Sequence, residues 1–90
     1  MIGQIAISKR GHDKNNFFII IAEDDIFCYL VDGKTRLLKK PKKKKLKHVS
    51  LTNYVNQEII DLIDKNFLLD AHIRKAIKKI EVKNKCQEKI

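Results

Sequence analysis

The residues with the clearest chemical potential in this sequence are cations, because they are concentrated in one segment. The 90-residue chain has 20 Lys and Arg against 11 Asp and Glu, which gives a formal net charge of +9. Between Asp32 and Glu58 there are nine cations and no acid, and the other eleven cations balance the eleven acids. We call residues 34–47 the basic segment. Its cations are Lys34, Arg36, Lys39, Lys40, Lys42, Lys43, Lys44, Lys45 and Lys47.

This block of one sign favours binding to a polyanion. Like charges repel one another in the free protein unless an opposite charge neutralises them. The alternatives are a solubilising loop and a nuclear import signal, which residues 41–47 resemble. Lysine ammonium groups contact phosphates as point charges and release counterions, so they give affinity with little sequence preference.

A second basic group surrounds Gly11, and His48 follows the basic segment directly. If the fold brings the two groups together, they can hold a folded RNA by its shape. Two arginines, Arg10 and Arg36, are candidates for bidentate contacts with phosphates or base edges, and pairing with a surface acid is the equal alternative. The cations of the second group are Lys9, Arg10, His12 and Lys14.

The aromatic residues offer one candidate for stacking on RNA bases. Four of them lie in apolar runs typical of core strands. Tyr54 follows the basic segment and is the stacking candidate, with packing against a helix as the favoured alternative. The four core aromatics are Phe17, Phe18, Phe27 and Tyr29.

Catalytic and metal-binding patterns are weak. The adjacent His12 and Asp13 do not make a triad, and the three His and two Cys lack the spacing of metal ligands. Cys28 and Cys86 are far apart in a small chain, which is typical of free thiols in a reducing interior. We therefore expect a cytoplasmic protein with no enzymatic activity, no cofactor, no metal and no small-molecule substrate.

The chain divides into two halves, one with the pattern of strands and one with the pattern of helices. Residues 2–51 predict five short strands: a first strand with Ile2, Ile5 and Ile7 and partial alternation over 4–8, then strands at 17–23, 26–31, 34–38 and 46–51. Asp32-Gly33 predicts a two-residue hairpin turn, because glycine supplies the positive φ that a type I′ turn needs. Gly11 is expected to have positive φ in the loop before residue 17. Five short strands with tight turns favour a small barrel.

The second half, residues 52–82, predicts two helices that cover this barrel. Strand 17–23 is apolar on both faces, so one face fills the barrel and the other needs a cover. Thr52 or Asn53 is expected to cap the first helix, Asn66 to end it and Asp70 to cap the second. Residues 83–90 predict a frayed tail. The apolar stripes at helical spacing are Val55, Ile59, Leu62 and Ile63, then Leu69, Ile73, Ala76, Ile77 and Ile80.

Residues 3–14 resemble the opening of a KOW motif, with a strand followed by a glycine-containing loop. Residues 31–34, 39–48, 51–53 and 73–76 look like bacterial KOW-domain RNA-binding proteins, which are related to archaeal and eukaryotic large-subunit ribosomal proteins. The resemblance covers residues 2–80. It implies an SH3-like barrel and binding of RNA, most often ribosomal RNA. KOW loops often carry a second glycine where this chain has Asn15 and Asn16.

The sequence therefore predicts a mainly β protein with added helices. We expect an SH3-like KOW barrel of five strands in 1–51, a packed helical extension in 52–82 and a tail in 83–90. The expected function is that of a monomeric RNA-binding protein of ribosomal type, a ribonucleoprotein component in translation whose partner is ribosomal RNA or the large ribosomal subunit.

Two other classes of function remain as alternatives. One is a protein-interaction module for a translation or transcription factor. The other is attachment to an anionic membrane surface, which is disfavoured because the chain has no lipid-anchor motif. No apolar run approaches the roughly 20 residues that a membrane span needs.

Overall fold

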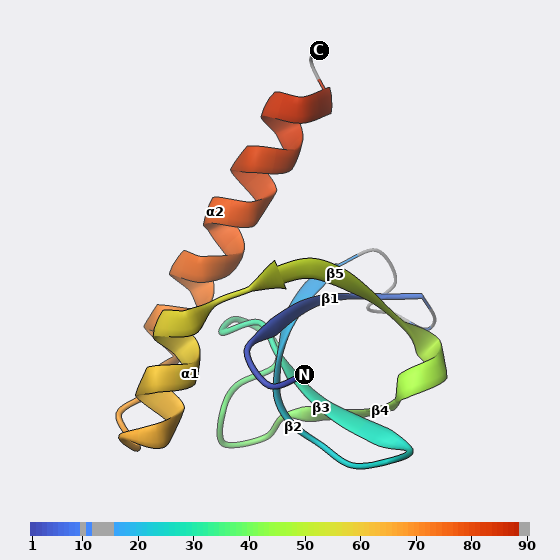
Figure 1. The fold of residues 1–90 in the computed structure, drawn as a ribbon, viewed down its shortest axis with the longest axis vertical. Helices are drawn as coiled ribbons and strands as arrows, with labels where there is room; N and C mark the ends of the chain where they lie inside the picture. The colour runs from blue at the N-terminus through green and yellow to red at the C-terminus, as the bar shows by residue number, and fades with distance from the viewer. Residues whose placement is uncertain (10, 12–15, 89–90) are drawn as a thin grey trace.

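The computed structural model describes residues 1–9, 11 and 16–88, with their side chains as far as Val82. These residues form a five-stranded antiparallel sheet and two helices (Figure 1). The protein is thus a small, mainly β domain with helices at its C-terminal end. In chain order the elements are β1 (Gln4–Ser8), β2 (Phe17–Glu23), β3 (Phe27–Val31), β4 (Lys42–Lys45), the 3-10 helix η1 (Leu46–His48), β5 (Val49–Val55), α1 (Gln57–Asp64) and α2 (Asp70–Glu88).

The strands lie in the order β4-β3-β2-β1-β5, and the sheet is strongly curled (Figure 1). Register shifts between Gln4 and Ala6 and between Ile20 and Ala22 mark irregularities of the kind that bend and twist a sheet. η1 carries the chain from one edge strand, β4, to the other, β5. Within the described residues no pairing joins β4 to β5, so the sheet is not closed.

Both faces of the sheet are buried, as the apolar pattern of residues 17–23 predicts. One face packs against the helices, and we call its buried residues the helix-side cluster. The other lies inside the curl, and we call its buried residues the inner cluster. The helix-side cluster is Ile5, Ile19, Val31, Ile59, Ile73, Ala76 and Ile77, and the inner cluster is Ala6, Phe18, Ile20, Cys28, Leu30 and Val49.

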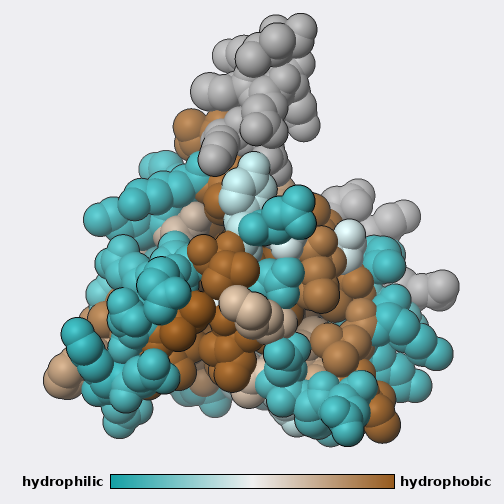
Figure 2. All heavy atoms as spheres, viewed as in Figure 1, coloured by the Kyte–Doolittle hydropathy of each residue, from teal (hydrophilic) through white to brown (hydrophobic). Residues whose placement is uncertain are grey.

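Apolar side chains visible on one face of the molecule gather between the helices and the sheet, with hydrophilic side chains around them (Figure 2). The predicted apolar stripes of the helices supply most of the cover for the sheet. Val55 and Leu69 do not take part, because Val55 ends β5 and Leu69 precedes α2, and both are exposed. These two assignments to the stripes were wrong.

The predicted strand at 34–38 and the two-residue hairpin at Asp32-Gly33 are also wrong. The Asp32 Oδ1 atom accepts hydrogen bonds from the backbone N–H groups of Lys34, Thr35 and Arg36, at 2.8 to 2.9 Å. A side chain that takes these N–H groups competes with strand pairing and curls the chain into a loop. β3 pairs with β2 on one side, and the strand on its other side is β4, which consists of four lysines. We call residues 32–41 the basic loop.

The ends of α1 correct one prediction and confirm another. β5 continues to Val55, so Thr52 and Asn53 lie in a strand, and Asn56 is the N-cap, with its Oδ1 accepting from the Ile59 N–H at 3.1 Å. α1 runs to Asp64, and Asn66 terminates it, as predicted. This residue has φ +61°, and the bonds from Asn66 N to Ile63 O and from Phe67 N to Leu62 O complete a Schellman motif.

α2 also differs from the prediction at both ends. The Asp70 carboxylate accepts from the Leu38 N–H at 2.9 Å, so it ties the basic loop to the helix. The His72 Nδ1 atom accepts from the Leu69 N–H at 3.0 Å, which satisfies a backbone donor at the start of the helix. The helix continues to Glu88, past residue 82, where we predicted that the helical part ends.

Candidate nucleic-acid interface

The basic segment is divided between three elements: the basic loop, β4 and η1. In β4, Lys43 and Lys45 are exposed whereas Lys42 and Lys44 are half-buried. Lys44 lies opposite the buried Cys28, so it shares the inner face of the sheet. Lysines on an edge strand also discourage pairing with the edge of another molecule. The lysines of β4 therefore form part of the sheet and also supply positive charge.

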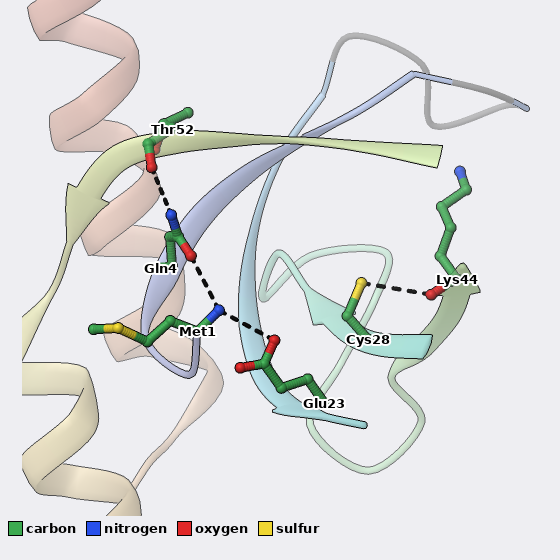
Figure 3. Close-up of polar contacts among 6 residues, drawn as sticks. All are labelled: Met1, Gln4, Glu23, Cys28, Lys44 and Thr52. Atoms are coloured by element: carbon green, nitrogen blue, oxygen red, sulfur yellow. Dashed lines mark hydrogen bonds and ion pairs between the residues drawn. The ribbon is translucent and has the colours of Figure 1, made fainter. Parts of the chain in front are cut away.

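At one end of the curled sheet, cations from two distant segments meet. The Lys44 Nζ atom donates to the Ser8 Oγ at the end of β1, and a Cβ on Gly11 would lie 3.8 Å from the same Nζ. The Lys9 N–H donates to the His48 carbonyl at 2.9 Å. In Figure 3 the Lys44 side chain extends from β4 towards the start of β5. We call Lys9, Lys44, Lys47 and His48 the η1 cluster.

The first loop is described only in part. Lys9 is exposed at the end of β1, and Gly11 has φ +83°, which confirms the predicted positive φ. Of the other first-loop residues that we predicted, Arg10, His12, Lys14 and Asn15 lie outside the described residues. The structure thus joins the two predicted basic groups through Lys9.

At the other end of β4, the basic loop is docked on α2. The Arg74 Nη1 atom donates to the Gly33 carbonyl at 2.7 Å. A Cβ on Gly33 would lie 2.6 Å from the Asp70 carbonyl oxygen and 3.1 Å from the Arg74 nitrogen. Gly33 does have positive φ, at +77°, but its absent side chain serves the close approach of loop and helix rather than a hairpin turn.

The basic loop contains one acid, Asp32, whose charge stabilises the loop. Burial raises the pKa of this carboxyl, but the hydrogen bonds from Arg36, Lys34 and Thr35 outweigh burial and leave the pKa below its ordinary value. Asp32 is therefore ionised at neutral pH and is held by the loop backbone. The sequence does not show that the Asp32 carboxylate accepts hydrogen bonds from the N–H groups of the basic loop.

The basic loop and the start of β4 together form a shallow hollow. Its charged lining consists only of cations: Arg36, Lys39, Lys40 and Lys42. The hollow offers a concave, positively charged surface to an anion. We call it the loop hollow.

Most cations of the basic segment have no acidic partner. Within the described part of the chain, six of them make no ion pair, while the N-terminal ammonium pairs with Glu23 at 3.1 Å (Figure 3). Lys43 lies over the Phe27 ring, 4.3 Å from its centroid. The exposed Asp24 has its pKa lowered by the backbone N–H groups of Phe27 and Ile26. The six cations are Lys34, Lys39, Lys40, Lys42, Lys45 and Lys47.

The aromatic residues do not form a stacking surface beside these cations in the described chain. Tyr54 is half-buried and packs against the helix-side cluster, so the alternative of helix packing is confirmed. Phe67 is 68% exposed, but it lies between α1 and α2. Sequence reasoning missed both the exposure of Phe67 and the contact of Arg74 with the loop. Phe67 directly follows Asn66, the predicted end of the first helix, and this position could have indicated that Phe67 lies in a connection between the helices.

Other chemistry has little support in the described residues. Burial raises the pKa of the Cys28 thiol, which makes it a poor nucleophile. In the described range, no three His, Cys, Asp or Glu side chains gather where they could hold a metal ion. No helix in that range is both long and apolar enough to cross a membrane.

Comparison with known proteins adds no family assignment. No protein-family model matches the chain, and no curated protein matches it either. The geometry of the basic segment therefore carries the functional proposal.

Proposed function

We propose that this is a non-enzymatic RNA-binding protein of ribosomal type, in which the curled sheet is an SH3-like KOW barrel. The supporting observation is the η1 cluster. Lys44 reaches Ser8 and the neighbourhood of Gly11, while the Lys9 backbone bonds to His48. Two cationic segments, separated by more than thirty residues in the sequence, thus share one end of the sheet.

The mode of binding follows from the residue types. Ammonium groups neutralise phosphates and release counterions, so they position the protein on RNA without reading its bases. Base stacking would need exposed aromatic rings. In the described residues the sheet aromatics are buried or half-buried, and Phe27 is covered by Lys43. We therefore infer binding to the RNA backbone with little sequence preference.

The partner in this proposal is ribosomal RNA, free or in the large ribosomal subunit, in the cytoplasm. The protein acts as a monomer and uses no cofactor, metal or small-molecule substrate. Its role is to screen the repulsion between backbone segments of a folded RNA, for which a charge of +9 on a small domain is suited.

The test is the salt dependence of RNA affinity. If about five cations meet phosphates, log K should fall against log salt with a slope of roughly −3 to −4. Lys45→Gln/Lys47→Gln removes two exposed cations next to η1, and it should reduce the magnitude of the slope by about 1 to 2. The matched control is Lys65→Gln/Lys75→Gln, which removes the same charge from the helices. Equal slopes for the two variants would contradict the assignment to the basic segment.

A protein-interaction module is the second candidate, favoured by one observation. Phe67 and Leu69 are 68% and 61% exposed beside the start of α2, where an apolar partner could pack. Salt-dependent RNA affinity distinguishes the two functions. If the protein binds RNA, Phe67→Ser should leave that affinity unchanged, and a wild-type protein without RNA affinity would favour the interaction module.

A further inference from the structure

Helix α2 carries exposed cations on both flanks of its buried stripe. The stripe consists of Ile73, Ala76 and Ile77. On one flank the first residue is Arg74, which bonds to the Gly33 carbonyl and so faces the basic loop. Lys78 lies one helical turn further on the same flank. No spacing of charges along the chain joins this flank to the basic segment.

The opposite flank has a different environment. Lys75 and Lys79 line a small cleft near the start of α1, together with Glu58 and His72. The acid in this cleft offsets part of their charge. The two flanks of α2 thus each carry two cations one helical turn apart, in contrasting surroundings.

The acids near the loop-facing flank of α2 either accept hydrogen bonds from the basic loop or follow Lys78 along the helix. Asp32 and Asp70 each accept backbone N–H groups of the basic loop. Glu81 comes one turn after Lys78 and is exposed. The Arg74–Gly33 bond joins this flank of α2 to the basic loop, so the cations of the loop hollow, Arg74 and Lys78 form one group of positive charges on neighbouring elements. We call it the α2 surface.

β4 separates the α2 surface from the η1 cluster. Lys42 belongs to the loop hollow and Lys44 to the η1 cluster, so their backbones are two steps of extended chain, about 7 Å, apart. Two binding surfaces on one rigid body raise affinity only for a ligand that reaches both. A ligand of that kind has at least two backbone segments within reach at the same time.

We propose that the α2 surface is a second phosphate-binding surface, and that the two surfaces together hold double-helical RNA. The inference rests on the proposed RNA-binding function and names the class of RNA. A double helix presents two phosphate strands across a groove and keeps its bases paired, so it is bound through shape and backbone. A single strand depends on aromatic stacking, for which the described residues near these cations offer no exposed ring.

The experiment compares two variants of equal charge. Lys39→Gln/Lys78→Gln removes two cations of the α2 surface, and Lys75→Gln/Lys79→Gln removes two from the opposite flank. All four lysines are exposed, and thermal melting checks that both variants fold. Affinity is measured by fluorescence anisotropy over a range of salt concentrations, with a hairpin RNA and with an unstructured single strand of the same length.

We expect the wild type to bind the hairpin more tightly than the single strand. Lys39→Gln/Lys78→Gln should reduce the magnitude of the hairpin salt slope by about 1 to 2, which is two phosphate contacts, and should remove most of the preference for the hairpin. Lys75→Gln/Lys79→Gln should leave both nearly unchanged.

Two results would overturn this inference while leaving the proposed function in place. One is salt-dependent wild-type binding that the two variants weaken equally, and the other is equal wild-type affinity for the hairpin and the single strand. A wild type that binds neither RNA would instead contradict the proposed function itself, and the α2 surface with it.

Discussion

The two faces of the curled sheet are buried by different means. The helix-side cluster depends on α1 and α2, which follow the last strand and supply Ile59, Ile73 and Ile77. The inner cluster is made by the sheet itself, because its curl brings Ala6, Phe18 and Leu30 together with Val49 at the start of β5. The proposed binding lysines of β4 and η1 border the inner face. The apolar stripes of the helices thus stabilise one face of the sheet, whereas the inner face combines stability with the presentation of charge by β4 and η1.

The largest expected effect is on the helix-side face. Ile59 is 1% exposed, so Ile59→Asp places a carboxylate among aliphatic side chains with no partner for its charge. The cost of burying such a group is several kcal/mol, a large share of the roughly 5–15 kcal/mol that stabilise a typical domain. We expect no cooperative urea unfolding transition followed by circular dichroism.

The control for this substitution is Val82→Asp in α2, where the side chain is 52% exposed and the change should stay within about 0.5 kcal/mol. A chain that ends at Asn56 keeps all five strands and loses both helices, and it should aggregate. If Ile59→Asp instead melts like the wild type, the helices do not stabilise the sheet, and their apolar stripes belong to a docking surface.

On the inner face, Phe18 is fully buried and is the test residue. Phe18→Ala leaves a cavity that the curled sheet fills only in part, and it should cost about 3–5 kcal/mol. Phe67→Ala removes the same ring where it is 68% exposed, and it should change stability by less than about 0.5 kcal/mol. The free energy of unfolding in urea measures both. A small loss for Phe18→Ala would show that the inner face is loosely packed.

The central strands could be predicted from the sequence because their apolar pattern reflects their own burial. Residues 17–23 form a strand with the predicted bounds, whereas the first strand begins at Gln4 rather than Ile2 and the third begins one residue late, at Phe27. The strand predicted at 46–51 is wrong at both ends, because Leu46–His48 is a 3-10 helix and the strand runs from Val49 to Val55. β4 was missed because a run of lysines has neither apolar alternation nor high strand propensity. It is a strand because β3 presents an edge to pair with, which its own residues do not show.

The candidate site shows the same division between local and distant information. The concentration of charge in residues 34–47 is visible in the sequence, but its separation into a basic loop, a strand and η1 is not. Asp32 looked like a turn residue, and its three bonds to the following backbone set the shape of the loop. The contact of Arg74 with Gly33 joins residues 41 positions apart, so no spacing rule could find it.

Gly11 and Gly33 both have positive φ, and a comparison of the two distinguishes the cost of backbone strain from the cost of lost close packing. Gly33→Ala adds a Cβ 2.6 Å from the Asp70 carbonyl oxygen on the helix side, so the loop must move off α2. Gly11→Ala adds a Cβ that lies 3.8 Å from the Lys44 Nζ, which is an ordinary van der Waals contact. Both changes carry the left-handed strain of about 1–2 kcal/mol. We expect urea unfolding to show that loss for Gly11→Ala and at least about 1 kcal/mol more for Gly33→Ala, and equal losses would contradict the docking of the loop.

The smallest expected effect concerns two neighbouring lysines of β4. Lys44 faces the inner side and donates to Ser8, whereas Lys45 is exposed and faces the other way. Lys44→Met keeps the length of the side chain and removes its donor, so it should cost about 0.5–1.5 kcal/mol, the usual net value of such a bond. Lys45→Met should change stability by less than about 0.5 kcal/mol. Urea unfolding at fixed salt concentration measures both.

A difference between these two variants would show that the inner-face lysine helps to hold β4 against β1, and that part of the positive charge is built into the fold. Equal stabilities would mean that Lys44 contributes nothing to the curl. The ammonium of Lys44 would then be as available to a phosphate as that of Lys45. The two faces of β4 would no longer differ in their contribution to stability.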